Sequence, residues 1–305
     1  MKDNLLIVGG SGFIGKSLAK KALNIGFKIT IISLNRVNKD QRIAGVSYLQ
    51  VDITNFKELR EKLSKISFSC VVNLSGYVNH SSYLDGGNEV INAHFNGLQN
   101  LLQALDWGNL SRFIQIGSSD EYGHNTAPQS ESMKESPISP YSLGKLASTR
   151  LLQMLHETED FPAVVLRLFL VYGEGQCKNR FLPQIINGCL LGKSFPVSKG
   201  RQLRDFCHID DITSGILKSL NKDEALGEVI NLGSGSPISI IKVVKEVQKI
   251  IGSGYPEYGK IAYRKNEIME LYPDIDKAKH LLGWHPKMNF IDGLKRTIDF
   301  YRLNN

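Results

Sequence analysis

Short strand-like runs and longer amphipathic stretches alternate along the first half of this chain. Apolar runs rich in β-branched residues occur at 4–8, 28–33, 46–51, 69–74, 111–117 and 162–168. Helical patterns lie between them, at about 12–25, 55–64, 88–106 and 141–156. This alternation is typical of parallel βαβ units and predicts an α/β fold built on a doubly wound parallel sheet.

Beyond about residue 170 the pattern loosens into shorter elements. Helices are predicted near 180–191, 210–220, 238–251 and 290–302. We therefore expect a large first domain and a smaller, partly discontinuous C-terminal domain that closes over the sheet edge. The predicted division gives 1–168 and about 205–232 to the first domain, and 169–204 and 233–305 to the second.

A glycine-rich turn follows the first predicted strand. Gly9, Gly12 and Gly15 stand between the apolar run and a helical pattern, with Phe13 and Ile14 inside the turn. Glycines permit a tight turn and a close approach to a pyrophosphate, and the helix N-terminus supplies amide donors. Any strand-turn-helix can carry glycines, but the position of these three predicts a dinucleotide site of the Rossmann type.

Tyr141 and Lys145 form the strongest candidate for chemistry. Four residues apart on a predicted helix, their side chains lie on the same face, one turn apart. A free tyrosine has a pKa near ~10, and a nearby ammonium favours the phenolate. We expect Lys145 to lower the pKa of Tyr141, so that Tyr141 exchanges a proton with a carbonyl or alcohol oxygen.

Composition narrows the class of partner. The chain has 305 residues, a net charge of +7 and a pI near 9.1, which favour anionic ligands. Its basic residues are scattered and form no nucleic-acid-binding module, so a phosphorylated cofactor and a nucleotide-linked substrate are the simpler expectation. We expect no nucleic-acid partner.

The cysteines and apolar runs bear on location. The four cysteines show no metal-ligand or disulfide spacing, and no apolar run reaches the ~20 residues of a membrane span. We therefore expect a cytoplasmic protein without a metal or a membrane segment.

Further motifs follow in a fixed order along almost the whole chain. They are Asp52-Ile53, Asn73-Leu74-Ser75-Gly76, Asn92, Gly117-Ser118-Ser119-Asp120-Glu121-Tyr122-Gly123, Arg167-Leu-Phe-Leu-Val-Tyr-Gly173, Arg204-Asp-Phe-Cys-His-Ile-Asp-Asp211, Asn231-Leu-Gly-Ser-Gly235, Arg264-Lys-Asn-Glu267 and Leu282-Gly-Trp284. With the glycine turn and Tyr141-x-x-x-Lys145, the set resembles the extended short-chain dehydrogenase/reductase family. Within it, the chain resembles the branch of nucleotide-sugar epimerases, dehydratases and ketoreductases.

The resemblance implies roles for the catalytic residues. Ser118 would hydrogen bond the sugar oxygen beside Tyr141, although it could also be a polar loop residue. Lys145 would additionally bind the nicotinamide ribose. The other implied cofactor contacts, beyond the glycine turn, are Ser33, Asn35, Arg36, Asp52, Ile53, Leu74, Ser75, Gly76, Asn92 and Tyr141. Asp52 could instead cap the following helix.

Cofactor choice depends on the end of the second predicted strand. An NAD-preferring relative would carry an acid at Ser33, where a carboxylate accepts both ribose hydroxyls. Here Ser33, Asn35 and Arg36 can instead donate to a 2′-phosphate, unless Arg36 is only a solvated loop residue. We expect NADP(H) to be preferred, with NAD(H) possible.

The resemblance also implies a nucleoside-diphosphate sugar as substrate. Implied substrate contacts are Ser118, Ser119, Asp120, Asn179, Arg204 and Arg264. The two arginines would bind the pyrophosphate, for which a planar guanidinium is suited; a surface salt bridge is the alternative for each.

Two departures from the family bear on the reaction. Dehydratases carry an Asp-Glu pair directly after the catalytic Ser or Thr. Counted back from Tyr122-Gly123, this chain has Ser119 and Asp120 at those two positions, and Glu121 comes one residue after them. Elimination of water is therefore disfavoured, unless the loop shifts by one residue. Leu170 stands where many epimerases have an asparagine.

We expect a reductase or dehydrogenase acting at C4 of a nucleotide-activated (deoxy)sugar, in the synthesis of surface-polysaccharide precursors. The alternatives are a C4 epimerase, a 4,6-dehydratase or a non-catalytic dinucleotide-binding protein. Relatives often pair two long helices across a dimer interface, and the helices at 92–105 and 141–155 therefore predict a homodimer.

Overall fold

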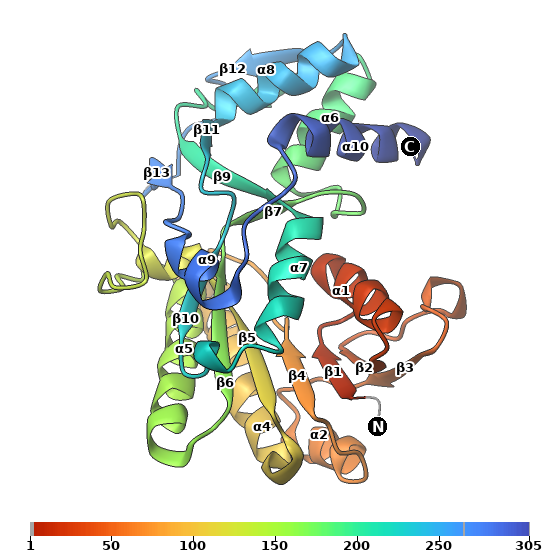
Figure 1. Ribbon diagram of the computed structural model, residues 1–305. Helices are drawn as coiled ribbons and strands as arrows, with labels where there is room; N and C mark the ends of the chain where they lie inside the picture. Colours follow the sequence, from red (N-terminus) through yellow and green to blue (C-terminus); the bar gives the residue numbers. More distant parts are fainter. Residues whose placement is uncertain (1–2, 265, 305) are drawn as a thin grey trace.

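A seven-stranded parallel sheet forms the lower part of the molecule in Figure 1. The computed structural model describes residues 3–264 and 266–304. The strand order is β10-β6-β5-β4-β1-β2-β3, and every neighbouring pair is parallel. The strands are β1 (Asn4–Val8), β2 (Lys28–Ser33), β3 (Val46–Gln50), β4 (Cys70–Asn73), β5 (Arg112–Ser118), β6 (Ala163–Leu168) and β10 (Val229–Leu232). The predicted doubly wound α/β fold is confirmed.

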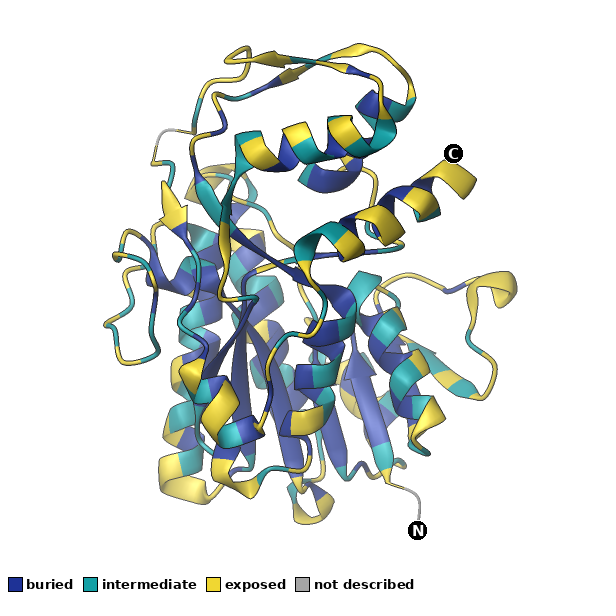
Figure 2. Ribbon diagram, turned by 45° about the horizontal axis from the view of Figure 1, so that its top comes forward, coloured by how far each residue is buried: buried dark blue, intermediate teal, exposed yellow. Residues whose placement is uncertain are grey.

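Helices cover both faces of this sheet. One face packs against α1 (Phe13–Asn24), α7 (Ile209–Ser219) and α9 (Asp276–Leu282), and the other against α2 (Phe56–Leu63), α4 (Gly97–Ala104) and α5 (Pro140–Glu159). The strands are largely buried, whereas the helices keep exposed outer faces (Figure 2). Because strands buried on both faces need apolar residues on both, they read as continuous apolar runs in the sequence.

A second layer stands above the carboxyl ends of the strands. It contains α6 (Phe181–Leu190), α8 (Ile240–Ile251) and α10 (Phe290–Leu303), which share a separate apolar core. Two small sheets belong to it, formed by β7 (Leu170–Tyr172), β9 (Leu203–His208), β11 (Pro237–Ser239) and β13 (Glu270–Leu271), and by β8 (Ser194–Val197) with β12 (Tyr255–Tyr258). Apart from their helices, these segments carry no clear periodicity, and the sequence predicted none of the strands.

Two elements cross the predicted domain division. β9 pairs with strands of the small sheet, although most of it falls in the range expected to join the large domain. α9 packs on the large sheet, although it falls in the range expected for the small domain. The division itself stays a prediction.

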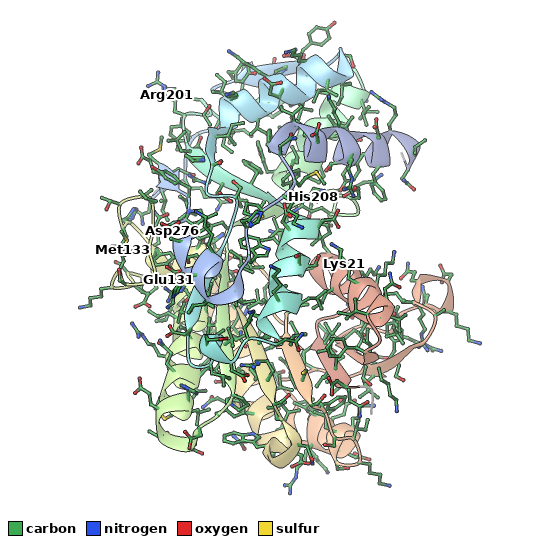
Figure 3. All side chains as sticks on the ribbon, viewed as in Figure 1. Lys21, Glu131, Met133, Arg201, His208 and Asp276 are labelled. Atoms are coloured by element: carbon green, nitrogen blue, oxygen red, sulfur yellow. The ribbon has the colours of Figure 1, made fainter. Side chains whose placement is uncertain are left out.

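Ion pairs join the two layers where α7 begins. Asp210 contacts Lys21 of α1 at 2.7 Å and Arg296 of α10 at 3.0 Å. His208, buried at the end of β9, lies 3.0 Å from Glu174, which Arg296 also contacts. Figure 3 shows Lys21 and His208 at this junction. The upper layer is thereby fixed to the helix that follows the glycine turn.

The predicted helix 88–106 is interrupted. The structure has α3 (Asn88–Ile91), a π-helical turn η3 (Asn92–Asn96) and then α4. A π-turn inserts one residue into the hydrogen-bond ladder and rotates the side chains that follow. The interruption lies beside Tyr141, whose ring is 5.2 Å from that of His94 in the π-turn.

Candidate active site

The glycine turn brings the backbone of β1 against that of β4. Gly9 has a φ of 75°, and a Cβ on it would lie 2.8 Å from the carbonyl oxygen of Leu74. A Cβ on Gly15 would lie 2.4 Å from the Cα of Gly10. Gly12 caps α1 without any side-chain hydrogen bond, and the first turn carries no acid. An open helix N-terminus free of negative charge fits the pyrophosphate of a dinucleotide.

The end of β2 presents the predicted adenosine-side residues. Ser33 is buried, and its hydroxyl donates to the carbonyl oxygen of Asn35 at 2.9 Å. Arg36 is exposed, and within residues 3–264 and 266–304 it makes no ion pair. The loop therefore leaves the Arg36 guanidinium available to a ligand.

Asp52 and Ile53 follow β3. The carboxylate of Asp52 accepts from the backbone N–H and the hydroxyl of Thr54, while Asn55 caps α2. Asp52 thus shapes the turn before α2 rather than capping the helix. Ile53 is buried, and its carbonyl oxygen accepts from Asn100.

Ser118, Tyr141 and Lys145 come together at the carboxyl end of β5. Ser118 is the last residue of that strand, and its hydroxyl hydrogen bonds to that of Tyr141. Ser139 caps α5, placing Tyr141 in its first turn and Lys145 one turn further on. The Lys145 ammonium donates to the carbonyl oxygen of Ile116 at 2.7 Å. The three side chains are therefore grouped at the end of β5, and their catalytic roles stay predictions.

One expectation about this group is wrong. Burial raises the pKa of Tyr141 above its ordinary value, the charge of Asp120 raises it further, and the Ser118 hydrogen bond opposes both. Burial lowers the pKa of Lys145 to about 8, against the charge of Glu121. Burial and the charge of Asp120 disfavour the phenolate more than the Ser118 hydrogen bond and the charge of Arg180 favour it, so Tyr141 holds its proton at neutral pH.

Two histidines that the sequence reasoning missed flank Tyr141. The ring of His94 lies 5.2 Å from that of Tyr141, and the ring of His80 lies 5.5 Å away, both edge to face. Burial, and then the charge of Lys145, lowers the pKa of His94 to about 3. Gly76 makes room for His94, since a Cβ there would lie 2.1 Å from the imidazole. No motif marks either histidine.

Asn92, Ser75 and Leu74 were predicted to contact the cofactor. The Asn92 side chain accepts from Asn96 at 2.7 Å, within the π-turn, whereas His94 of the same turn faces Tyr141. Ser75 donates to the Asn73 side chain at 2.6 Å. Their roles toward a cofactor stay predictions.

Five residues besides Ser118 were predicted to contact the substrate. Asp120 is 3.6 Å from His80. Burial raises the pKa of Asp120, and the charges of His80, Arg204 and Arg264 lower it. Ser119 is buried, and Asn179 and Arg264 are exposed. The charges of the two arginines thus favour the ionised form of Asp120, and their contact with a pyrophosphate stays a prediction.

Arg204 has a partner in the chain. Its guanidinium contacts Glu267 at 2.6 Å and donates to the carbonyl oxygen of Leu203 at 2.9 Å. The salt bridge that was the alternative for Arg204 is therefore present. Binding a pyrophosphate remains open to it, because a guanidinium has five N–H donors.

Glu121 lies in the protein interior. It is fully buried, and its carboxylate accepts from the Ser118 backbone N–H and from Arg167. The one-residue loop shift that would restore a dehydratase Asp-Glu pair does not occur.

Among the described residues no three His, Cys, Asp or Glu side chains are placed to hold a metal ion, and Cys70, Cys177, Cys189 and Cys207 are free thiols. No helix within the described ranges is both long and apolar enough to cross a bilayer.

The glycine cradle and the Ser-Tyr-Lys group on a doubly wound sheet define a dinucleotide-dependent α/β protein of the extended short-chain dehydrogenase/reductase class. The sequence model of the NAD dependent epimerase/dehydratase family matches residues 5–233. The chain belongs to this family, as its motifs indicated.

Relatives and solved structures are similar over almost the full chain. A UDP-glucuronate 4-epimerase of Thermodesulfobacterium geofontis is 29% identical, covering 98% of this chain and 96% of its own. A dTDP-glucose 4,6-dehydratase of Haemophilus influenzae is 25% identical, with coverage of 99% and 98%. The solved UDP-glucuronic acid 4-epimerase of Bacillus cereus, in complex with UDP-glucuronic acid and NAD, is 27% identical with a TM-score of 0.88, covering 99% of this chain and 100% of its own.

Proposed function

We propose that this protein is a 4-ketoreductase, and reversibly a 4-dehydrogenase, of a nucleoside-diphosphate (deoxy)sugar used for surface-polysaccharide precursors. The observation that carries the proposal is the hydrogen-bonded pair of Ser118 and Tyr141 at the carboxyl end of β5, with Lys145 one helical turn away. Parallel α/β sheets bind their ligands at that edge.

Each residue of the group has a separate role in the reaction at C4. A nicotinamide bound at the glycine turn would supply or accept the hydride. Tyr141 gives its proton to O4 of the 4-keto sugar, and Ser118 donates a hydrogen bond to the same oxygen. The raised pKa of Tyr141, caused by burial and by Asp120, keeps that proton in place at neutral pH, as reduction requires. Lys145 uses one donor on Ile116 and has two left for ribose hydroxyls.

The position of Glu121 argues against water elimination. Elimination requires an acid and a base facing the substrate, but Glu121 is buried against Ser118 and Arg167. Of the two carboxylates only Asp120 is partly exposed, next to His80.

The test is a turnover assay. Purified protein is incubated with NADPH or NADH and with 4-keto-6-deoxyhexoses linked to UDP, dTDP, GDP or CDP, and oxidation of the reduced cofactor is followed by absorbance. We expect turnover with at least one of them. No turnover with any would overturn the reductase assignment.

A C4 epimerase is the second candidate, and the similarity to two UDP-glucuronate 4-epimerases favours it. An epimerase oxidises and re-reduces C4 without net use of cofactor. It would therefore retain NAD(H) through purification and interconvert UDP-glucuronate or UDP-glucose with its C4 epimer when no cofactor is added. A requirement for added reduced cofactor would instead support the reductase.

We propose NADP(H) as the preferred cofactor and NAD(H) as the alternative. Several solved neighbours are complexes with NAD. The support for NADP(H) in this chain is local: β2 ends at Ser33 without an acid, and Arg36 is exposed and unpaired among the described residues.

We also propose a cytoplasmic homodimer. Leu143 and Met154 of α5 are 48% and 44% exposed, and Leu84 on the turn before α3 is 90% exposed. Pairing these helices with those of a second copy would cover them. A sedimentation mass near the 34.0 kDa of one chain at micromolar concentration would contradict the dimer.

A further inference from the structure

Glu121 joins three elements from a fully buried position. One carboxylate oxygen accepts from the backbone N–H of Ser118, at 2.8 Å. The other accepts from the Thr149 hydroxyl of α5 and from Arg167 of β6, each at 2.9 Å. The carboxylate therefore ties the strand end that carries Ser118 to the helix that carries Tyr141 and Lys145.

The local sequence makes room for this carboxylate. A Cβ on Gly117 would lie 2.7 Å from an oxygen of Glu121 and 3.1 Å from the Arg167 side chain. Ser118 caps the short 3-10 turn after β5, and Glu121 is the third residue of that turn and completes the capping box. A glycine before the catalytic serine is thus required by a contact behind the site.

The charged side chain in contact with Glu121 is Arg167. Arg167 lies between Glu121 and Glu135, contacting the latter at 2.6 Å, and also stacks over the Tyr122 ring. Around Lys145 the groups are the Ile116 carbonyl oxygen, neutral His94, Tyr141 and Glu121. Within the described chain, Glu121 is the only acid whose charge raises the pKa of Lys145 against the effect of burial.

We propose that Glu121 is a positioning residue of the active site, which fixes Ser118 against α5 and brings a buried negative charge to the helix turn of Lys145 through the Thr149 hydroxyl, which bonds both the Glu121 carboxylate and the Lys145 carbonyl oxygen. The inference rests on the proposed function, because its effect on turnover is measured on that reaction. Misplacement of a reacting group by about 1 Å can cost about 10²-fold in rate.

Glu121→Gln and Glu135→Gln form a matched pair. Each replaces a carboxylate that accepts from Arg167, but only Glu121 also contacts Ser118 and Thr149. We expect Glu121→Gln to lower kcat by about 10²-fold with little change in KM, and Glu135→Gln to keep a kcat close to that of the wild type. Equal losses in both variants would overturn the proposal and assign Glu121 to the salt bridge alone.

A second readout needs no substrate. Protein labelled with 13C at the lysine Cε is titrated by NMR, and the Lys145 signal is assigned by its loss in Lys145→Met. We expect a midpoint near pH 8 in the wild type and in Glu135→Gln, and a lower midpoint in Glu121→Gln. An unchanged midpoint in Glu121→Gln would overturn the electrostatic role. If the wild type turns over no nucleotide sugar, the proposed function fails and this titration still decides on Glu121.

Two milder variants cover the case in which Glu121→Gln does not fold. Glu121→Asp keeps the charge and shortens the reach, so the Lys145 midpoint should stay near that of the wild type while kcat falls. Thr149→Val removes one donor to the carboxylate, and kcat should fall less than in Glu121→Asp. Wild-type kcat in both variants would contradict the positioning role.

Discussion

The two sides of Tyr141 differ in how far solvent reaches their polar groups. On one side lie His94, Lys145 and Glu121, each at most 5% exposed. On the other lie His80 and Asp120, with side chains 32% and 25% exposed, and the exposed Arg264. Buried polar groups take most of their hydrogen-bond partners from within the chain, whereas open ones can take theirs from a ligand.

This difference separates two tasks. The closed side holds reacting groups in place through bonds among neighbouring elements, as Glu121 does for Ser118. On the open side, His80 and Asp120 contact each other at 3.6 Å. Their remaining polar atoms are suited to binding a substrate. Substitutions on the closed side should therefore change kcat or stability, and those on the open side should change KM or cofactor preference.

Tyr141→Phe gives the largest expected effect. It removes only the hydroxyl that exchanges the proton, so kcat should fall by about 10²–10⁴-fold, while cofactor affinity and the unfolding midpoint stay near those of the wild type. Steady-state kinetics, cofactor titration and thermal unfolding measure these quantities. If turnover were retained, Tyr141 would not be the acid and a non-catalytic dinucleotide-binding role would gain support.

Tyr122→Phe is the matched control for that experiment. Tyr122 is also buried, and its hydroxyl donates to Asn231 at 2.8 Å rather than to Ser118. Losing this bond should cost about 1 kcal/mol of unfolding free energy and leave kcat almost unchanged. A kcat loss as large as that of Tyr141→Phe would mean that the two tyrosines act only through packing.

Lys145→Met tests how much the burial of the Lys145 ammonium lowers the unfolding free energy. Burial lowers the pKa of Lys145 from 10.5 to about 8, a difference worth about 3 kcal/mol. The unfolded chain therefore binds more protons between these pH values, so the unfolding free energy of the wild type rises with pH across that window. The methionine variant should be more stable at pH 7, with the gain shrinking toward pH 10, and inactive. Denaturant unfolding at both pH values measures it, and a pH-independent difference would contradict it.

The sequence identified some of the residues on the closed side of Tyr141. The Tyr141–Lys145 spacing and the strand-end position of Ser118 identified the reacting groups, because helix periodicity and strand order are local properties. The sequence missed the raised pKa of Tyr141, since that follows from burial by elements distant in the chain. It also missed His94, whose orientation depends on the π-turn and on Gly76.

The open side was less predictable. Arg204 and Asp120 were identified by family motifs, but the bond of Arg204 to Glu267 joins β9 to a loop some sixty residues later. His80 lies in a loop without periodicity, and only the fold brings it beside Tyr141. The strands of the upper layer were missed for the same reason: their residues are short runs whose pairing is set by tertiary contacts.

Arg36→Ala tests the predicted contact between the loop after β2 and the cofactor. If Arg36 receives a 2′-phosphate, NADPH binding should weaken by about 1.5–3 kcal/mol, the scale of a hydrogen bond to a charged group. NADH binding should hardly change, because its ribose carries no phosphate. Calorimetric titration with both cofactors measures the two affinities. Ser33→Asp should act in the opposite sense, weakening NADPH and strengthening NADH. Equal losses for both cofactors in Arg36→Ala would assign the residue to the loop alone.

The smallest effect is expected for Arg264→Gln, compared with Arg204→Gln. Arg264 is exposed, so its loss should raise the KM for the nucleotide sugar and change the unfolding free energy by less than about 0.5 kcal/mol. Arg204→Gln should raise KM and also lower stability, because it leaves Glu267 unpaired in a half-buried site. Steady-state kinetics and denaturant unfolding of both variants separate the two outcomes. An unchanged KM in Arg264→Gln would remove that residue from the pyrophosphate site and leave Arg204 as its predicted cation.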